Sequence, residues 1–120
     1  MFEVKISESR NALLTVLKGR LDVQETRQAR DKIKQGIDRL KPGFTAITDL
    51  REFIPLVPEA RNNLLEAMLY AKEKGIGRVI RVMGNAVSQL GESQAKPEQA
   101  GYTADYVSSI EEAKKILGWV

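Results

Sequence analysis

The sequence predicts an α/β fold: a mixed, mostly parallel sheet flanked by helices, with elements in the order β-β-α-β-α-β-α-β-α. Three observations support this prediction. Two segments with strand periodicity open the chain, segments of helical periodicity carry recognisable start and stop residues, and short apolar runs separate those helices. Strands that alternate with helices favour a parallel sheet. The length of 120 residues suits a single domain, residues 1–120.

Residues 2–9 and 12–19 are expected to pair as an antiparallel hairpin at the start of the sheet. The first segment alternates apolar with polar residues, as a strand with one buried face does. Its apolar residues are Phe2, Val4 and Ile6. The second segment, ALLTVLKG, is more apolar, and a turn-forming sequence at 9–11 separates the two.

Residues 21–43 predict the first helix. Asp22 and Glu25 have the spacing of a capping box, and Pro42-Gly43 is a strong stop signal. The apolar stripe at helical spacing consists of Ala29, Ile33, Ile37 and Leu40, with Thr26 and Gly36 beside it.

Residues 44–50 are expected to form a short buried strand, and residues 58–75 the second helix. Pro58 suits the first helical position, since its missing N–H is not needed there, and Gly75 suits the end. The side chains expected to point inward are Leu64, Leu65, Ala67, Met68 and Ala71. The segment GIGRVI that follows lacks the third glycine of a dinucleotide loop and precedes a strand, so it is interpreted as a helix stop.

The last third of the chain predicts a strand at 77–83, a weak helix at 85–101, a short strand at 104–109 and a final helix to residue 120. Ser109 and Glu112 have capping-box spacing.

Three large side chains in this region have their own interpretation. Arg78 and Arg81, three apart in a strand, are expected on opposite faces, where each reaches solvent or a carboxylate. Trp119 is expected in the core, whereas an exposed tryptophan would suit a partner or a homodimer contact.

The composition excludes several function classes. The chain has no Cys and no His, which removes disulfides, thiolate sites, His-dependent triads and most zinc sites. No enzyme activity, cofactor or metal is therefore expected. The net charge of +3 comes from basic residues mixed with carboxylates, so nucleic-acid binding is not expected. No apolar run is long enough for a membrane span and no signal sequence is evident, which favours a cytoplasmic protein.

The most unusual segment is Phe53–Val57, five consecutive residues without a polar side chain. Two interpretations stay open: the side chains close the core beneath the second helix, or some remain exposed as a docking patch. The second interpretation predicts a partner-binding surface made of Arg51, Glu52, Phe53, Ile54, Leu56, Val57, Pro58 and Glu59.

An alternative function is that of a sensor for a small molecule, a nucleotide or a lipid. Its ligand would lie between residues 49–58 and the Gly84–Asn85 turn, because ligands of α/β sheets bind beyond the carboxyl ends of strands. Asp22 and Asp49 each follow a strand and would complete the site. A third and less favoured hypothesis is a carboxylate-dependent enzyme that uses Asp22, Asp49 and Glu52, because carboxylates at strand ends can hold Mg²⁺ or exchange protons. Asp22, however, is also explained as a helix cap.

Three segments resemble STAS domains, the family of anti-sigma factor antagonists and sulfate-transporter tails: GRLDVQETRQARDKI, TDLREF and GYTADYVSSIEEAKKILG. The order of elements agrees with that family over essentially the whole chain. The resemblance implies a non-catalytic regulatory domain of a bacterial protein, whose partner is an anti-sigma factor or a related regulator.

The chain departs from that family where the second helix begins. Phosphorylatable members carry Asp-Ser followed by Ser/Thr-Gly, and the matching positions here are Val57, Pro58, Glu59 and Ala60. Proline has no hydroxyl to phosphorylate, so the resemblance implies a member without the serine switch. Glu59 places a fixed negative charge in the first turn of the helix.

Overall fold

The structure is a computed structural model that describes residues 1–54, 56–84 and 104–119. The described elements are β1 (Phe2–Ser7), β2 (Ala12–Gly19), α1 (Val23–Ile37), β3 (Thr45–Phe53), α2 (Pro58–Glu73), β4 (Val79–Val82), β5 (Asp105–Val107) and α3 (Ile110–Leu117). Their order confirms the sequence prediction, and the weak helix predicted at 85–101 lies outside the described residues.

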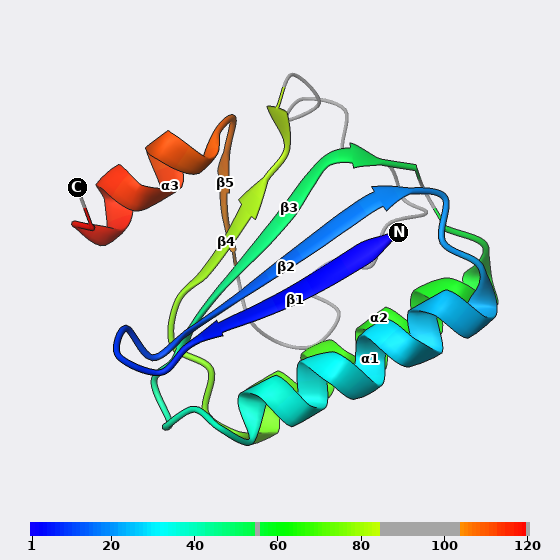
Figure 1. Ribbon diagram of the computed structural model, residues 1–120, viewed down its shortest axis with the longest axis horizontal. Helices are drawn as coiled ribbons and strands as arrows, with labels where there is room; N and C mark the ends of the chain where they lie inside the picture. Colours follow the sequence, from blue (N-terminus) through cyan, green and yellow to red (C-terminus); the bar gives the residue numbers. More distant parts are fainter. Residues whose placement is uncertain (55, 85–103, 120) are drawn as a thin grey trace.

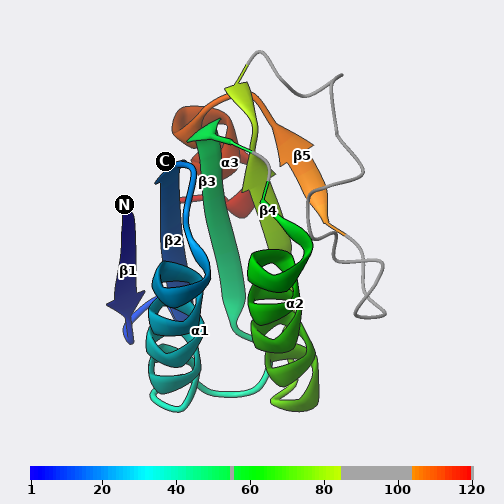
Figure 2. The same cartoon turned by 90° about the vertical axis from the view of Figure 1, so that its right-hand side faces the viewer.

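The strands form one sheet in the order β1-β2-β3-β4-β5. β1 and β2 pair antiparallel, as the hairpin prediction expected, and the other neighbours pair parallel. α1 and α2 lie side by side on one face of the sheet, and α3 lies on the other (Figures 1 and 2). Because α1 and α2 run opposite to β2 and β3, both helices begin at the edge of the sheet where those strands end (Figure 1).

The face beneath α1 and α2 holds most of the core. One cluster lies toward the carboxyl ends of β2 and β3 and includes Leu17, Leu21, Ala29, Leu50, Leu56, Ala60, Leu64 and Met83. A second lies toward the other end and includes Leu13, Ile37, Phe44 and Ala71. The predicted helix stripes are confirmed at most positions, but Leu65 is only half-buried and belongs to neither cluster.

On the opposite face, α3 lies over β4 and β5. Ile110, Ala113 and Leu117 pack on a cluster of sheet residues that includes Ile80 and Val107. Trp119 is half-buried against the same cluster, as predicted, and the Arg10 guanidinium lies 4.7 Å from the centre of its ring.

Both predicted capping boxes have the expected residues at the helix start, but only the first forms both of the expected hydrogen bonds. Asp22 Oδ1 accepts a hydrogen bond of 2.7 Å from the Glu25 backbone N–H, and Glu25 Oε1 accepts one from the Asp22 backbone N–H. This capping box is therefore confirmed. Ser109 caps α3 by accepting from the Glu112 backbone, but the Glu112 carboxylate accepts from Ser108 instead of Ser109. The reciprocal half of that predicted box is therefore wrong.

The amino ends of β3 and β4 meet at three glycines, here called the glycine corner: Gly43, Gly75 and Gly77. The Gly43 N–H donates to the Gly75 carbonyl at 2.6 Å, and the Gly77 N–H donates to the Phe44 carbonyl at 2.8 Å. A Cβ at Gly77 would lie 2.5 Å from the Gly43 carbonyl oxygen. The interpretation of GIG as a helix stop and turn is confirmed, because α2 ends at Glu73 and Gly75 has a φ of +88°. Its close contact with Gly43 was not predicted.

The two arginines of the β4 region differ in environment. Arg78 is exposed and its Nε lies 3.3 Å from a carboxylate oxygen of Asp105, as expected. Arg81 is only 4 % exposed, because β4 lies between two strands and is covered on both faces. The expectation that Arg81 reaches solvent was wrong. Among the described helices, none has both the length and the apolar character needed to span a membrane.

Candidate functional site

β3 is longer than the sequence predicted. It continues through Arg51 and Glu52 to Phe53, and its last residues pair with Lys18 and Gly19 of β2. The predicted end at residue 50 was wrong because the two charged side chains resemble a loop, whereas their backbone takes part in the sheet.

The pairing of β2 with β3 is irregular at this end. Val16 pairs with Asp49, but Lys18 pairs with Glu52, so β3 has one residue more than β2 across this interval. Residues three apart in a regular strand point to opposite faces, whereas here Asp49 and Glu52 lie on the same face. The Lys18 ammonium lies 3.5 Å from the Glu52 carboxylate. Sequence reasoning missed Lys18, whose only signal was its place at the end of a predicted strand.

Asp49 forms three hydrogen bonds with Arg51. The residue is only 7 % exposed, and its carboxylate accepts hydrogen bonds from Arg51 Nε at 3.0 Å, from Nη2 at 2.7 Å and from the backbone N–H at 3.1 Å. The bonds from the Arg51 side chain lower the pKa of the Asp49 carboxyl below its usual value despite its burial. Asp49 is therefore a charged partner of Arg51 and not an open ligand.

The Arg51 side chain also covers the turn after β4. A Cβ added to Gly84 would lie 3.3 Å from Arg51 Cγ, so the glycine leaves room for the arginine stem. Of the residues of the alternative ligand site, Gly84 lies under Arg51, Asp22 caps α1, and Asn85 lies outside the described residues, so that site stays a prediction. Within the described ranges, no group of three or more acidic side chains is placed to hold a metal ion.

The apolar segment divides between core and solvent, which answers the question that the sequence left open. Leu56 is 4 % exposed and belongs to the core cluster, and Phe53 is half-buried against it. Ile54 and Val57 are 42 % and 49 % exposed. The assignment of Leu56 to the docking surface was therefore wrong. Pro55 lies outside the described residues.

The segment leads directly into α2. Val57 is the N-cap residue and is extended, as a residue before proline tends to be, but its side chain forms no capping bond. Pro58 is the first helical residue and Glu59 lies in the first turn, and both are exposed.

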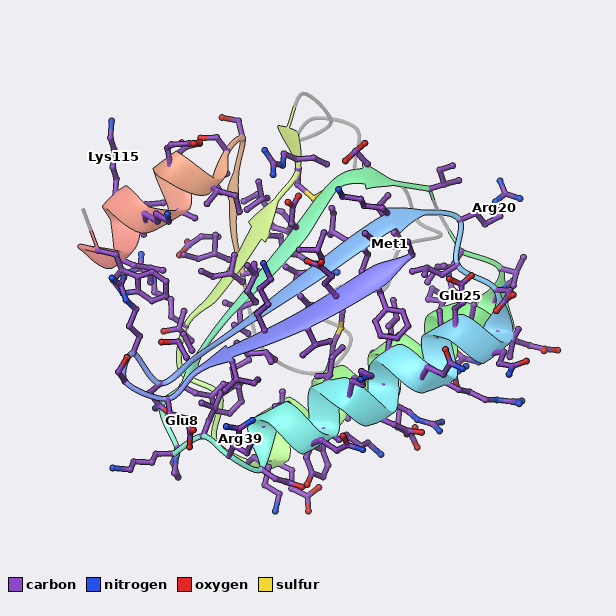
Figure 3. The ribbon with its side chains drawn as sticks, viewed as in Figure 1. Met1, Glu8, Arg20, Glu25, Arg39 and Lys115 are labelled. Atoms are coloured by element: carbon purple, nitrogen blue, oxygen red, sulfur yellow. The ribbon has the colours of Figure 1, made fainter. Side chains whose placement is uncertain are left out.

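The exposed residues at this end of the molecule are here called the corner surface: Arg51, Glu52, Ile54, Val57, Pro58 and Glu59. It lies where β3 turns into α2, at the right of Figure 1. Arg20, which follows β2, projects into solvent at the same end of the molecule (Figure 3). Two apolar side chains surrounded by charged ones can dock on a protein, but they offer no nucleophile or paired catalytic groups.

No protein-family model and no curated protein sequence matches this chain. The fold, however, is similar to two solved structures. The anti-sigma factor antagonist SpoIIAA in its unphosphorylated form matches with a TM-score of 0.69 at 20 % identity, over 100 % of both chains. The Bacillus cell fate determinant SpoIIAA in its phosphorylated form matches with a TM-score of 0.62 at 17 % identity, over 98 % of this chain and 99 % of the other. The fold implied by the resemblance to STAS domains is therefore confirmed.

Proposed function

We propose that this chain is a non-catalytic regulatory domain that binds a protein partner through the corner surface. The observation that carries the proposal is the exposure of Ile54 and Val57 on either side of the buried Leu56. By analogy with SpoIIAA, an anti-sigma factor antagonist, the expected partner is an anti-sigma factor or a related regulator.

The anchoring of the segment supports this use. Phe53 and Leu56 pack on the core. Each of the exposed residues Ile54 and Val57 is therefore next to a residue that is fixed in place. Residues whose neighbours are already packed on the core lose less conformational entropy when a partner binds.

The surrounding charges support it as well. Protein interfaces commonly have an apolar centre and a polar rim, and Arg51, Glu52 and Glu59 provide such a rim around Ile54 and Val57. Hiding two partly exposed aliphatic side chains contributes about 1 kcal/mol each. A stable complex therefore requires a larger interface, of about 1,000 Å² or more, with these two side chains near its centre.

We further propose that serine phosphorylation at the start of α2 does not control this binding. Pro58 stands at the first helical position and has no hydroxyl. Glu59 supplies a permanent negative charge one residue later, which stabilises the helix end without a switch. Binding should consequently be the same before and after phosphatase treatment.

A binding experiment on the full chain tests the proposal. The double variant Ile54→Asp/Val57→Asp is compared with Leu69→Asp, which changes an apolar side chain of similar exposure toward the end of α2. Partners captured from the source cells are identified by mass spectrometry, and the affinity of the purified partner is then measured. We expect the double variant to lose roughly 100-fold in affinity and the control to retain it. Unchanged affinity in a correctly folded double variant would overturn the proposal.

A further inference from the structure

A cavity of about 200 Å³ lies between the second face of the sheet and α3. Leu14 and Ile47 line it from the sheet, Ile110 and Lys114 from α3, and Trp119 from the segment after that helix. The cavity exists because α3 packs over β4 and β5, at the side of the sheet away from β1 (Figure 1). This leaves Leu14 of β2 only half-buried.

The walls of this cavity are almost entirely apolar. The cavity is partly open to solvent, and its apolar walls offer few polar partners to the water that fills it. The volume exceeds the roughly 150 Å³ of an engineered apolar cavity that binds benzene. The space therefore suits an apolar group somewhat larger than one aromatic ring, such as a short alkyl chain.

Positive charges surround the cavity. Lys5, the cross-strand neighbour of Leu14, and Lys114 are both lining residues. The Arg10 guanidinium lies 4.7 Å from the centre of the Trp119 ring. The Glu3 carboxylate is 3.8 Å from the Lys5 ammonium and is exposed. Among the described residues that line the cavity, Lys5 and Lys114 are cations and none carries a carboxylate, which favours an anionic group at the entrance.

We propose that this cavity binds an amphipathic monocarboxylate, with its hydrocarbon part against Leu14, Ile47 and Trp119 and its carboxylate toward Lys5 and Lys114. The site lies on the face of the sheet opposite α1 and α2 and shares no residue with the corner surface. This inference is therefore independent of the proposed function, and either can fail alone.

Fluorescence titration of the full chain with sodium octanoate tests it. Trp119 is the single tryptophan of the chain and lines the cavity, so its emission reports on occupancy. We expect a saturable change and a higher melting temperature with octanoate. Octylamine, which has the same chain and the opposite charge, should bind roughly tenfold more weakly because it meets the same cations. Equal binding of the two probes, or no saturable change, would overturn the proposal.

Two variants locate the site. Lys114→Gln should weaken octanoate binding about two- to fivefold, the range expected for one solvent-exposed ion pair. Lys115→Gln, one residue later on α3, should leave it unchanged, because Lys115 points away from the sheet (Figure 3). Leu14→Phe, which adds volume to the wall, should abolish binding. Equal effects of the two lysine variants, or octanoate binding that survives Leu14→Phe, would contradict the assignment.

Discussion

The connections between strands and helices differ at the two ends of the sheet. At the glycine corner, backbone groups bond directly to one another, and there is no space for a side chain at Gly77. At the corner surface, side chains decide the arrangement: Leu56 points into the core while Ile54 and Val57 stay exposed. At the first end, the backbone segments therefore pack closely against each other. The second carries apolar side chains that the core does not use, at the edge where α/β proteins commonly bind their ligands.

The largest expected effect separates the two kinds of apolar residue at the corner surface. Leu56→Ala should lower the free energy of unfolding by about 2–5 kcal/mol, because it removes a buried side chain from the core cluster. Val57→Ala should change that free energy by less than about 0.5 kcal/mol. Chemical denaturation measures both. Similar losses for the two variants would mean that the segment does not divide between core and surface.

The glycine corner should be the next most sensitive place. Gly77→Ala should cost about 1–3 kcal/mol of unfolding free energy, since the new Cβ would collide with the Gly43 carbonyl. Gly19→Ala is the control: Gly19 has a φ of +69° but open space around it, so only the backbone strain of about 1 kcal/mol is expected. A smaller loss at Gly77 than at Gly19 would show that the backbone crossing is looser than described.

The Asp49–Arg51 pair predicts a pH dependence of stability. The pKa of the folded Asp49 carboxyl lies below its unfolded value of about 3.8, so ionised Asp49 stabilises the fold above that pH. This contribution is about 1.5 kcal/mol, the low end of the range for hydrogen bonds to a charged group, because Arg51 is partly exposed; it is lost as the pH falls through the lowered pKa. In urea denaturation from pH 6 downward to about pH 2, Asp49→Asn should remove this component of acid sensitivity.

Asp105→Asn provides the matched control, because Asp105 forms a single, exposed pair with Arg78. Its effect on stability should stay below about 0.5 kcal/mol at every pH. If the two variants flatten the pH profile equally, the Asp49–Arg51 pair has no special role.

A smaller change in stability, of the opposite sign, separates stability from binding. Val57 is the N-cap of α2 and its side chain makes no capping bond, so Val57→Asp should stabilise the fold by about 0.5–1 kcal/mol. The same substitution places a charge at the centre of the corner surface and should weaken partner binding. Thermal unfolding and affinity measurements on this one variant should therefore change in opposite directions. A variant that is less stable and binds equally well would contradict both expectations.

Much of the fold followed from local signals in the sequence. The Asp22–Glu25 capping box, the hairpin and Pro58 at the start of α2 depend on residues close together in the chain, and each was predicted. The end of β3 was not, because it depends on pairing with β2 and on an irregularity that no local pattern reveals.

The candidate site was predicted as a segment but not side chain by side chain. Leu56 and Val57 are neighbours of similar hydrophobicity, and only the position of α2 decides which of them is buried. The burial of Arg81 was missed for a related reason, since strand periodicity does not show how many layers cover a central strand.

The most direct test of the corner surface is photo-crosslinking in the source cells with benzoylphenylalanine placed at Val57 or at Leu69. The two side chains have nearly equal exposure, 49 % and 50 %, and both belong to the α2 region, so position alone distinguishes them. We expect a discrete crosslinked partner from position 57 and none from position 69. A partner that crosslinks from position 69 but not from position 57 would contradict the assignment of the corner surface as the docking site.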